Sequence, residues 1–125
     1  APDYVRAGRY HDPECCARET AALLALPQPP TCILFPDDFS AIGGLNTIAA
    51  AGLRVPDDIS VAGYDGIYLS QTMSPRLTTY RQALGRTAAA RLIELIEKPR
   101  TTVMDRTVVT GVLLPGGTVA CPCTE

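Results

Sequence analysis

Two short apolar runs constrain the fold of this chain more than any other feature. Thr31–Phe35 and Ile59–Gly63 are nearly all apolar, and proline or aspartate residues flank both. Such runs are typical of strands that are covered on both faces, as in a parallel sheet. An amphipathic segment, 37–52, separates them, and two strands joined through a helix form a βαβ unit. We therefore predict an α/β fold with a parallel sheet.

Capping residues and apolar spacing predict the two helices of this region. The first begins at Asp12-Pro13, where aspartate can cap the helix and proline suits the first helical position. The second follows Pro36-Asp37-Asp38, and Gly52 is placed to end it. The apolar stripes predicted for the two helices are Ala17, Ala21 and Leu24, and Ile42, Leu45 and Ala49.

The second half of the chain continues the same alternation. A loop rich in turn residues is expected from Tyr64 to Pro75, followed by an extended segment at Leu77–Arg81. Another helix is predicted from an apolar stripe that ends before Pro99. Its members are Leu84, Ala88, Leu92 and Leu95. A β-rich stretch from Thr107 to Leu114 and a short returning strand from Thr118 to Cys121 complete the prediction.

Charge and hydropathy exclude two kinds of partner for this chain. Its net charge is −2, and its eleven basic residues are scattered singly, without the basic stripe of a DNA-binding surface. No apolar stretch approaches the roughly 20 residues of a membrane helix. The first residues also lack the pattern of a signal peptide. We expect no membrane contact, and no DNA contact by this chain alone.

The five cysteines indicate a reducing compartment. They are Cys15, Cys16, Cys32, Cys121 and Cys123. An odd number without a regular framework argues against a secreted disulfide scaffold. The spacing is not that of a zinc site. A metal site that combines these cysteines with His11 is the weaker alternative, and we expect neither a metal nor a cofactor.

Acidic residues follow both predicted strands. Asp37-Asp38 comes after the first and Asp65 after the second, and ligands bind at the carboxyl ends of strands in open parallel sheets. These carboxylates can accept hydrogen bonds from sugar or ribose hydroxyls. The structural alternative for Asp37 and Asp38 is helix capping, which needs only one of them. We expect the other to be free to face a cleft.

The chain offers little for catalysis. Its single histidine, His11, stands beside a helix start, which is more typical of an exposed loop residue than of a general base. No nucleophile elbow, phosphate-binding loop or zinc-protease helix is present. We predict that the protein is not an enzyme.

Four segments resemble known landmarks of one family. The stretch 52–65, Gly-Leu-Arg-Val-Pro-Asp-Asp-Ile-Ser-Val-Ala-Gly-Tyr-Asp, closely resembles the signature of LacI/GalR-type transcription regulators. Segment 37–43 resembles the family's Asn-Asp-x-x-Ala-x-Gly helix start, and 75–82 its Pro-Leu-Thr-Thr-x-x-Gln segment. Leu113-Leu114-Pro115 resembles its Leu-Leu-Pro before the last strand. The match covers nearly the whole chain in order and spacing.

The resemblance implies a fold like the type I periplasmic binding proteins, in which two α/β subdomains enclose a small ligand. Residues 1–125 would form part of the effector-binding domain, mainly its C-terminal subdomain. The segment 83–114 resembles one that packs on the N-terminal subdomain, which would lie before Ala1, as would the DNA-binding domain. Regulators of this kind are cytoplasmic dimers, and their effectors are sugars or nucleosides.

The resemblance also implies four ligand-binding residues, namely Tyr10, Asp37, Asp65 and Gln82. Tyr10 falls on an aromatic residue that can stack on a sugar or base, and Gln82 on a crossover between subdomains. The alternatives are core packing for Tyr10 and a hydrogen-bonded hinge residue for Gln82. Asp37 stands where the family has Asn, Gly66 where it has a second Asp, and Cys121 where it has Arg.

Two apolar surfaces are candidates for self-association. The residues that resemble the family's dimer contacts are Ile42, Leu45, Ile67, Leu69 and Met73. The alternative is that Ile42 and Leu69 belong to the core. The stripe of the helix between Leu84 and Glu97 lacks its partner surface, so we expect the chain to self-associate through it.

Two other kinds of protein share this fold class. A sugar-binding protein of a transport system has a similar acidic cleft, but the turn 54–60 and the cysteines favour the regulator. An enzyme of the flavodoxin-like type would need a phosphate-binding loop or a nucleophile, which the sequence does not supply.

Overall fold

The computed structural model describes residues 2–99 and 106–121. After a short 3-10 turn (Pro2–Tyr4), the elements are α1 (Pro13–Leu24), β1 (Cys32–Leu34), α2 (Asp38–Ala50), β2 (Ser60–Tyr64), α3 (Tyr68–Thr72), β3 (Thr78–Arg81), α4 (Leu84–Glu97) and β4 (Val112–Leu114). The strands form one sheet in the order β1-β2-β3-β4. The first three are parallel, and β4 is antiparallel to β3. The predicted α/β fold with a parallel sheet is confirmed.

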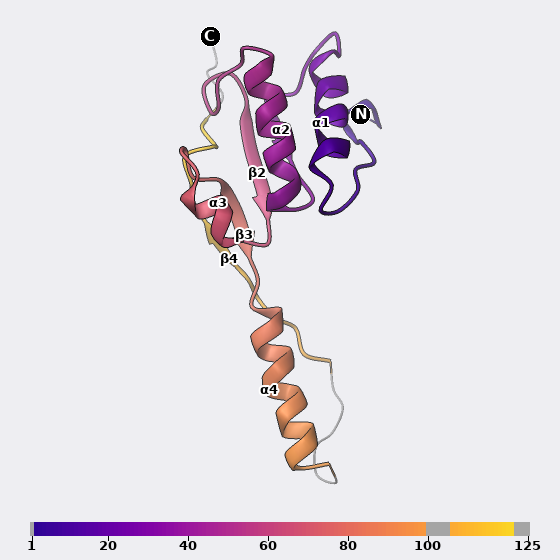
Figure 1. The fold of residues 1–125 in the computed structure, drawn as a ribbon, viewed down its shortest axis with the longest axis vertical. Coiled ribbons are helices and arrows are strands. Elements are labelled where there is room, and N and C mark those ends of the chain that lie inside the picture. Colours follow the sequence, from indigo (N-terminus) through magenta and orange to yellow (C-terminus); the bar gives the residue numbers. More distant parts are fainter. Residues whose placement is uncertain (1, 100–105, 122–125) are drawn as a thin grey trace.

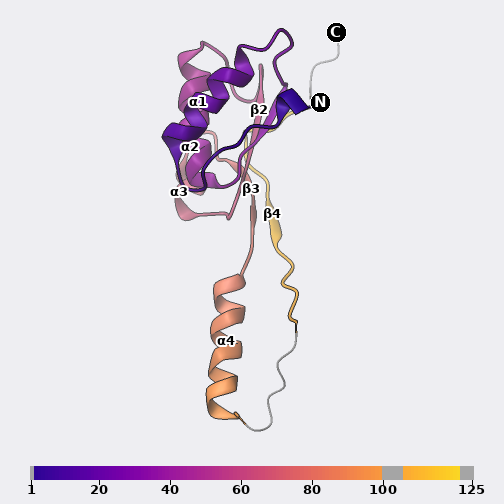
Figure 2. The same cartoon turned by 90° about the vertical axis from the view of Figure 1, so that its right-hand side faces the viewer.

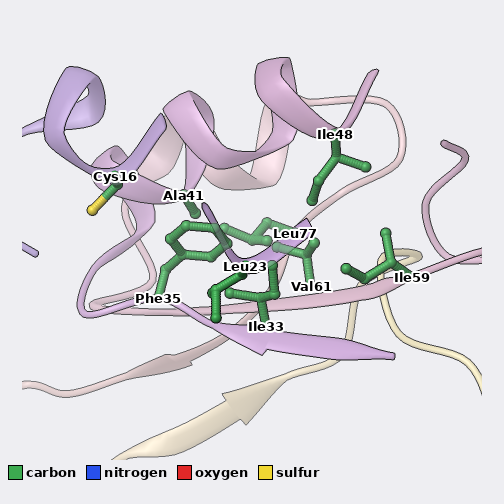
Figure 3. Close-up of a cluster of buried hydrophobic side chains, with 9 residues drawn as sticks. All are labelled: Cys16, Leu23, Ile33, Phe35, Ala41, Ile48, Ile59, Val61 and Leu77. Atoms are coloured by element: carbon green, nitrogen blue, oxygen red, sulfur yellow. The ribbon is translucent and has the colours of Figure 1, made fainter. Parts of the chain in front are cut away.

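Helices α1 and α2 pack on each other and cover one face of the sheet (Figures 1 and 2). The core lies between these helices and the strands, as Figure 3 shows. Its buried members are Cys16, Leu23, Ile33, Phe35, Ala41, Ile48, Ile59, Val61 and Leu77. Burial of apolar area here supplies the main driving force for folding.

The predicted helix caps are present. Asp12 accepts a hydrogen bond from the Cys15 amide (2.9 Å), and Asp37 accepts one from the Ser40 amide (2.8 Å). Each such bond satisfies one of the free amides at a helix start. Gly52 follows α2 with φ +77°, a conformation that glycine adopts without steric cost.

Helix α4 projects away from the rest of the molecule (Figures 1 and 2). The chain leaves the sheet after β3, forms α4, and returns through residues 106–111 to β4. No residue of α4 is buried, and Leu92, Ile93 and Ile96 are more than half exposed.

The predicted apolar stripes of α1 and α2 are only partly correct. Leu24 and Leu45 are partly buried and pack against the core, whereas Ala21 and Ala49 are exposed. The fully buried residues are Cys15, Cys16, Thr20 and Leu23 in α1, and Asp38, Ser40, Ala41, Gly43, Gly44 and Ile48 in α2. A Cβ atom at Gly44 would lie 2.0 Å from the Phe35 ring, so the glycine makes room for that ring. Counting apolar residues alone overlooks threonine and glycine on a buried face.

Two further expectations need correction. The region from Tyr64 to Pro75 contains a short helix, α3, rather than loop alone. Within residues 106–121, only Val112–Leu114 forms a strand, and Thr118–Cys121 does not. Thr118 instead receives a hydrogen bond from the Val61 amide (2.8 Å) and donates its hydroxyl to the Val61 carbonyl (2.7 Å). In the part of the chain that the structure describes, no helix has the length and hydropathy to cross a membrane.

Candidate functional site

Tyr10 and Asp65 meet at the carboxyl edge of the sheet. The Tyr10 hydroxyl donates a hydrogen bond to Asp65 Oδ2 at 2.5 Å. The pKa of Tyr10 is raised to about 12. The hydrogen bond to Asp65 is the largest cause, and partial loss of solvation is the second. Asp65 follows β2 with φ +98°, a conformation that residues with side chains rarely adopt, and its amide donates to the Tyr80 carbonyl (2.9 Å). The turn therefore holds the Asp65 carboxylate in a defined place.

A row of aromatic rings begins at Tyr10. The Tyr10 and His11 rings are stacked with centroids 4.3 Å apart, and the Phe39 ring lies 5.8 Å from that of His11. Tyr10 is 61% exposed and Phe39 40% exposed. Exposed aromatic faces beside a carboxylate suit a ligand with an apolar face and polar edges. Sequence reasoning overlooked Phe39 because no spacing rule joins residue 39 to residues 10 and 11.

Asp37 lies beneath this row and is fully buried. It accepts hydrogen bonds from the amide of Ser40 (2.8 Å), the hydroxyl of Ser40 (2.7 Å) and the amide of His11 (3.0 Å). Burial alone would raise the pKa of Asp37, but the bonds from His11 and Ser40 hold it below its usual value. Asp37 thus caps α2 and fixes the loop that carries Tyr10.

Asp38 is also fully buried. Its Oδ1 accepts a hydrogen bond from the Thr79 hydroxyl (2.5 Å), and its Oδ2 accepts one from the Ile67 amide (2.9 Å). The expectation that one acid of the pair is free to face a cleft is wrong. Asp38 instead ties α2 to β3 and to the turn after Asp65.

Gln82 follows β3 at the same edge of the sheet and is partly buried. Its Oε1 accepts a hydrogen bond from the Tyr64 hydroxyl (3.3 Å). The Tyr64 ring is stacked on that of Tyr80, with centroids 5.7 Å apart. Sequence reasoning overlooked both tyrosines, although each lies near the end of a predicted extended segment.

The structure thus brings Tyr10 and Asp65 into direct contact and places Asp37 under the same loop. A cavity of about 480 Å³ lies elsewhere, between the chain near Tyr4–Gly8 and β1. None of the four predicted ligand residues lines it. We base the candidate site on the convergence of polar and aromatic groups rather than on this cavity, which is lined by the N-terminal segment, α1 and the edge strand β1.

The described residues contain no group of three or more side chains that could hold a metal ion. Cys15 and Cys16 are buried, and Cys32 and Cys121 are exposed, all as free thiols. Burial raises the pKa of the Cys16 thiol, which favours its uncharged form. Cys123 lies outside the described residues.

The five predicted dimer residues lie on α2 and around α3. Ile42, Leu45, Ile67 and Met73 are partly exposed, and Leu69 is 45% exposed. Leu45 and Met73 share a cavity of about 280 Å³ with Leu53 and Val55. Neither Ile42 nor Leu69 belongs to the buried core cluster.

An open α/β sheet with a carboxylate, an amide and aromatic rings at its carboxyl edge defines a small-molecule-binding class of domain. Residues 2–119 match the model of the periplasmic binding protein-like domain. The chain belongs to this domain family.

Its relatives are transcription regulators. The chain is 44% identical over 102 residues to the probable HTH-type transcriptional repressor ExuR of Bacillus subtilis (strain 168), a match that covers 79% of the chain and 30% of the repressor. The chain therefore spans about a third of the length of this relative.

Solved structures of LacI-type regulators are also similar to this chain. The dimeric Lac repressor is 31% identical, with a TM-score of 0.80 over 90% of the chain and 42% of that protein. A LacI family regulator from Arthrobacter sp. FB24 in complex with lactose is 30% identical, with a TM-score of 0.77 over 86% of the chain and 41% of that protein. The resemblance to LacI-type regulators expected from the sequence is confirmed.

Proposed function

We propose that this chain is the effector-sensing part of a bacterial transcription regulator. Its ligand is a small hydroxylated molecule, a sugar or a nucleoside, bound at the carboxyl edge of the sheet. Tyr10, Asp65, Gln82 and Asp37 are the ligand-binding residues of this proposal. DNA binding belongs to a domain outside these 125 residues, in agreement with the net charge of −2.

The observation that carries the proposal is the contact between Tyr10 and Asp65. One carboxylate oxygen of Asp65 accepts from Tyr10, and a carboxylate can accept further hydrogen bonds from ligand hydroxyls. The exposed Tyr10 ring offers an apolar face next to these polar groups. Sugars and nucleosides combine the same two features, an apolar face and a hydroxylated edge.

Asp37 has a different place in the site. Its carboxylate is fully buried and already accepts three hydrogen bonds, so a ligand reaches it only if the His11 loop moves. In the observed arrangement it supports Tyr10 from below. A ligand that displaces the loop would change this contact, which is one way to couple binding to a conformational change.

The proposed function involves no catalysis. Ligand binding shifts the balance between two arrangements of the effector domain, because the ligand has different affinities for them. The repressors among its relatives favour this regulator over the alternative, a sugar-binding protein of a transport system. A cytoplasmic location follows from the regulator proposal.

We further propose that the protein is a homodimer. The five residues of the proposed interface are apolar and partly exposed, namely Ile42, Leu45, Ile67, Leu69 and Met73. In a twofold dimer the same patch of both subunits meets, so partly exposed apolar residues of this kind are candidates for the interface. The exposed stripe of α4 is a second apolar surface that a second copy of the chain could bury.

Thermal unfolding of the full-length protein with a panel of neutral sugars and nucleosides, lactose included, tests the effector proposal. A ligand present at 100 times its Kd stabilises the folded state by about 2.7 kcal/mol, which raises the unfolding midpoint measurably. The Asp65→Ala variant should lose this rise, measured against its own unfolding midpoint without ligand. If no compound of either class raises the midpoint of the wild-type protein, the proposed effector class is wrong.

A further inference from the structure

The side-chain amide of Gln82 has a defined orientation in this structure. The Tyr64 hydroxyl donates to Gln82 Oε1 at 3.3 Å, which occupies one of the two lone pairs of this oxygen. The other end, Nε2, carries two N–H donors. An amide held in this way directs Oε1 towards Tyr64 and Nε2, with its donors, away from it.

Tyr64 is itself held in place by a second tyrosine. Tyr64 and Tyr80 are directly paired in the register of β2 and β3, so their side chains leave the same face of the sheet side by side. Their rings are stacked with centroids 5.7 Å apart and planes 21° from parallel. Aromatic pairs at this separation stabilise each other beyond simple burial.

Tyr80 is fixed in turn by the segment that returns from α4. The Gly111 amide donates to the Tyr80 hydroxyl at 2.9 Å. A Cβ atom at Gly111 would lie 2.3 Å from the Tyr80 ring and 2.6 Å from the Arg81 carbonyl oxygen. Only glycine allows the returning segment to approach this closely. A continuous series of contacts therefore leads from Gly111 through Tyr80 and Tyr64 to Gln82.

We propose that Tyr64 is a positioning residue that orients Gln82 as a hydrogen-bond donor to the bound effector. The role of Gln82 as a ligand contact rests on the proposed function. Tyr64 acts through Gln82, and Tyr80 and Gly111 hold Tyr64 in the position that this requires.

This arrangement specifies the chemistry of the effector. Asp65 is an acceptor and the free end of Gln82 is a donor, so the two groups recognise opposite features of one ligand. The effector must present a hydroxyl to Asp65 and an acceptor to Gln82, such as a ring oxygen, a carbonyl oxygen or a ring nitrogen. A ligand that offers Gln82 only an apolar edge would leave its N–H groups unpaired, which is costly in a partly buried site.

Nuclear magnetic resonance of the 15N-labelled chain tests the positioning role without any ligand. Tyr64→Phe removes only the hydroxyl and keeps the ring that stacks on Tyr80. We expect it to shift the Gln82 side-chain amide signals while the backbone signals of β2 and β3 stay in place. Tyr68→Phe, at a side chain that is 85% exposed, is the matched control and should leave the Gln82 signals unchanged. Unchanged Gln82 signals in Tyr64→Phe would overturn the proposal.

Binding measurements then test the donor role, with whichever compound of the sugar and nucleoside panel stabilises the wild-type protein. Tyr64→Phe should weaken its binding about three- to tenfold, the usual effect of one lost hydrogen bond. The same substitution should have no further effect in a Gln82→Ala background, because Tyr64 acts only through Gln82.

Gln82→Glu replaces the donor by an acceptor and should also weaken binding. Wild-type affinity of Gln82→Glu contradicts the donor role. If no compound binds, the proposed function fails, and the amide signals still decide whether Tyr64 holds Gln82.

Discussion

The hydroxyl of Tyr10 lies 2.5 Å from Asp65 Oδ2, although the two residues are 55 positions apart in the chain. Tyr10 belongs to the loop before α1, and Asp65 to the turn after β2. Their hydrogen bond joins the aromatic row to the carboxyl edge of the sheet. The position of the Asp65 carboxylate therefore depends on both segments.

Asp65→Ala should weaken the effector response of the full-length protein at least tenfold. A hydrogen bond to a charged group contributes about 1.5–3 kcal/mol, which corresponds to a loss of affinity of this size. Asp57→Ala is the matched control, since Asp57 is exposed. Among the described residues, its only ion pair is the one with Arg54 at 3.5 Å. Effector titration of both variants provides the measurement, and an unchanged response of Asp65→Ala would show that Asp65 is not a ligand contact.

Tyr10 should resist ionisation in alkaline solution. Its pKa is raised from 10.0 to about 12, chiefly by the hydrogen bond to Asp65. Because the folded state holds this proton more tightly than the unfolded state, the stabilising contribution is complete below pH 10 and disappears as the pH rises towards 12. Ultraviolet titration of tyrosinate should show a component near pH 12 that is absent from Tyr10→Phe. If Asp65→Ala retains the component, Asp65 is not its cause.

The fold could be predicted from the sequence because its signals are local. The apolar runs at Thr31–Phe35 and Ile59–Gly63 correspond to β1 and β2, and Asp37 caps α2 as its position before the helix indicated. Proline, aspartate and glycine act on their immediate neighbours, so a sequence pattern is enough to place them.

The site could be predicted only in part, because its contacts depend on register and on loop paths. The pairing of Tyr64 with Tyr80 follows from the alignment of β2 with β3, which no local pattern specifies. The hydrogen bond between Asp38 and Thr79 could not be predicted either, since the two residues lie 41 positions apart in sequence. A pair of adjacent acids shows that one can cap a helix, but not what the second one contacts.

Asp38→Ala should destabilise the fold strongly. The carboxylate is fully buried, and its loss leaves the Thr79 hydroxyl and the Ile67 amide without their acceptor. Loss of two hydrogen bonds to a buried charged group should cost about 3–5 kcal/mol in the free energy of unfolding. Urea unfolding measures this cost, and Asp57→Ala should change the free energy by less than about 0.5 kcal/mol. Equal effects of the two substitutions would contradict the structural role of Asp38.

The Arg54–Asp58 pair should make part of the stability depend on acid pH. Arg54 donates to both carboxylate oxygens of Asp58 at 2.9 and 3.0 Å, and this hydrogen bonding lowers the pKa of Asp58 from 3.8 to about 2. The folded state therefore favours the charged carboxylate, and the stabilisation is complete well above pH 3.8 and disappears as the pH falls towards 2. Asp58→Asn should be less stable than the wild type at pH 6 and equal to it near pH 2. Asp57→Asn removes a longer ion pair of 3.5 Å and should lose less stability at pH 6 than Asp58→Asn.

Self-association of the 125-residue chain should depend on α4. Leu92 is 58% exposed and Ile96 69% exposed on this helix, and no residue of α4 is buried. A charge placed in the apolar stripe would have to be desolvated in any interface that covers it, so Leu92→Glu should shift the chain towards the monomer. Ala90→Glu makes the same change in charge on a different side of the helix, and should leave the association constant close to that of the wild type. Sedimentation equilibrium measures the constants, with circular dichroism to confirm that α4 remains helical. A wild-type chain that is monomeric at all accessible concentrations, or equal weakening by the two variants, would show that the stripe of α4 does not mediate self-association.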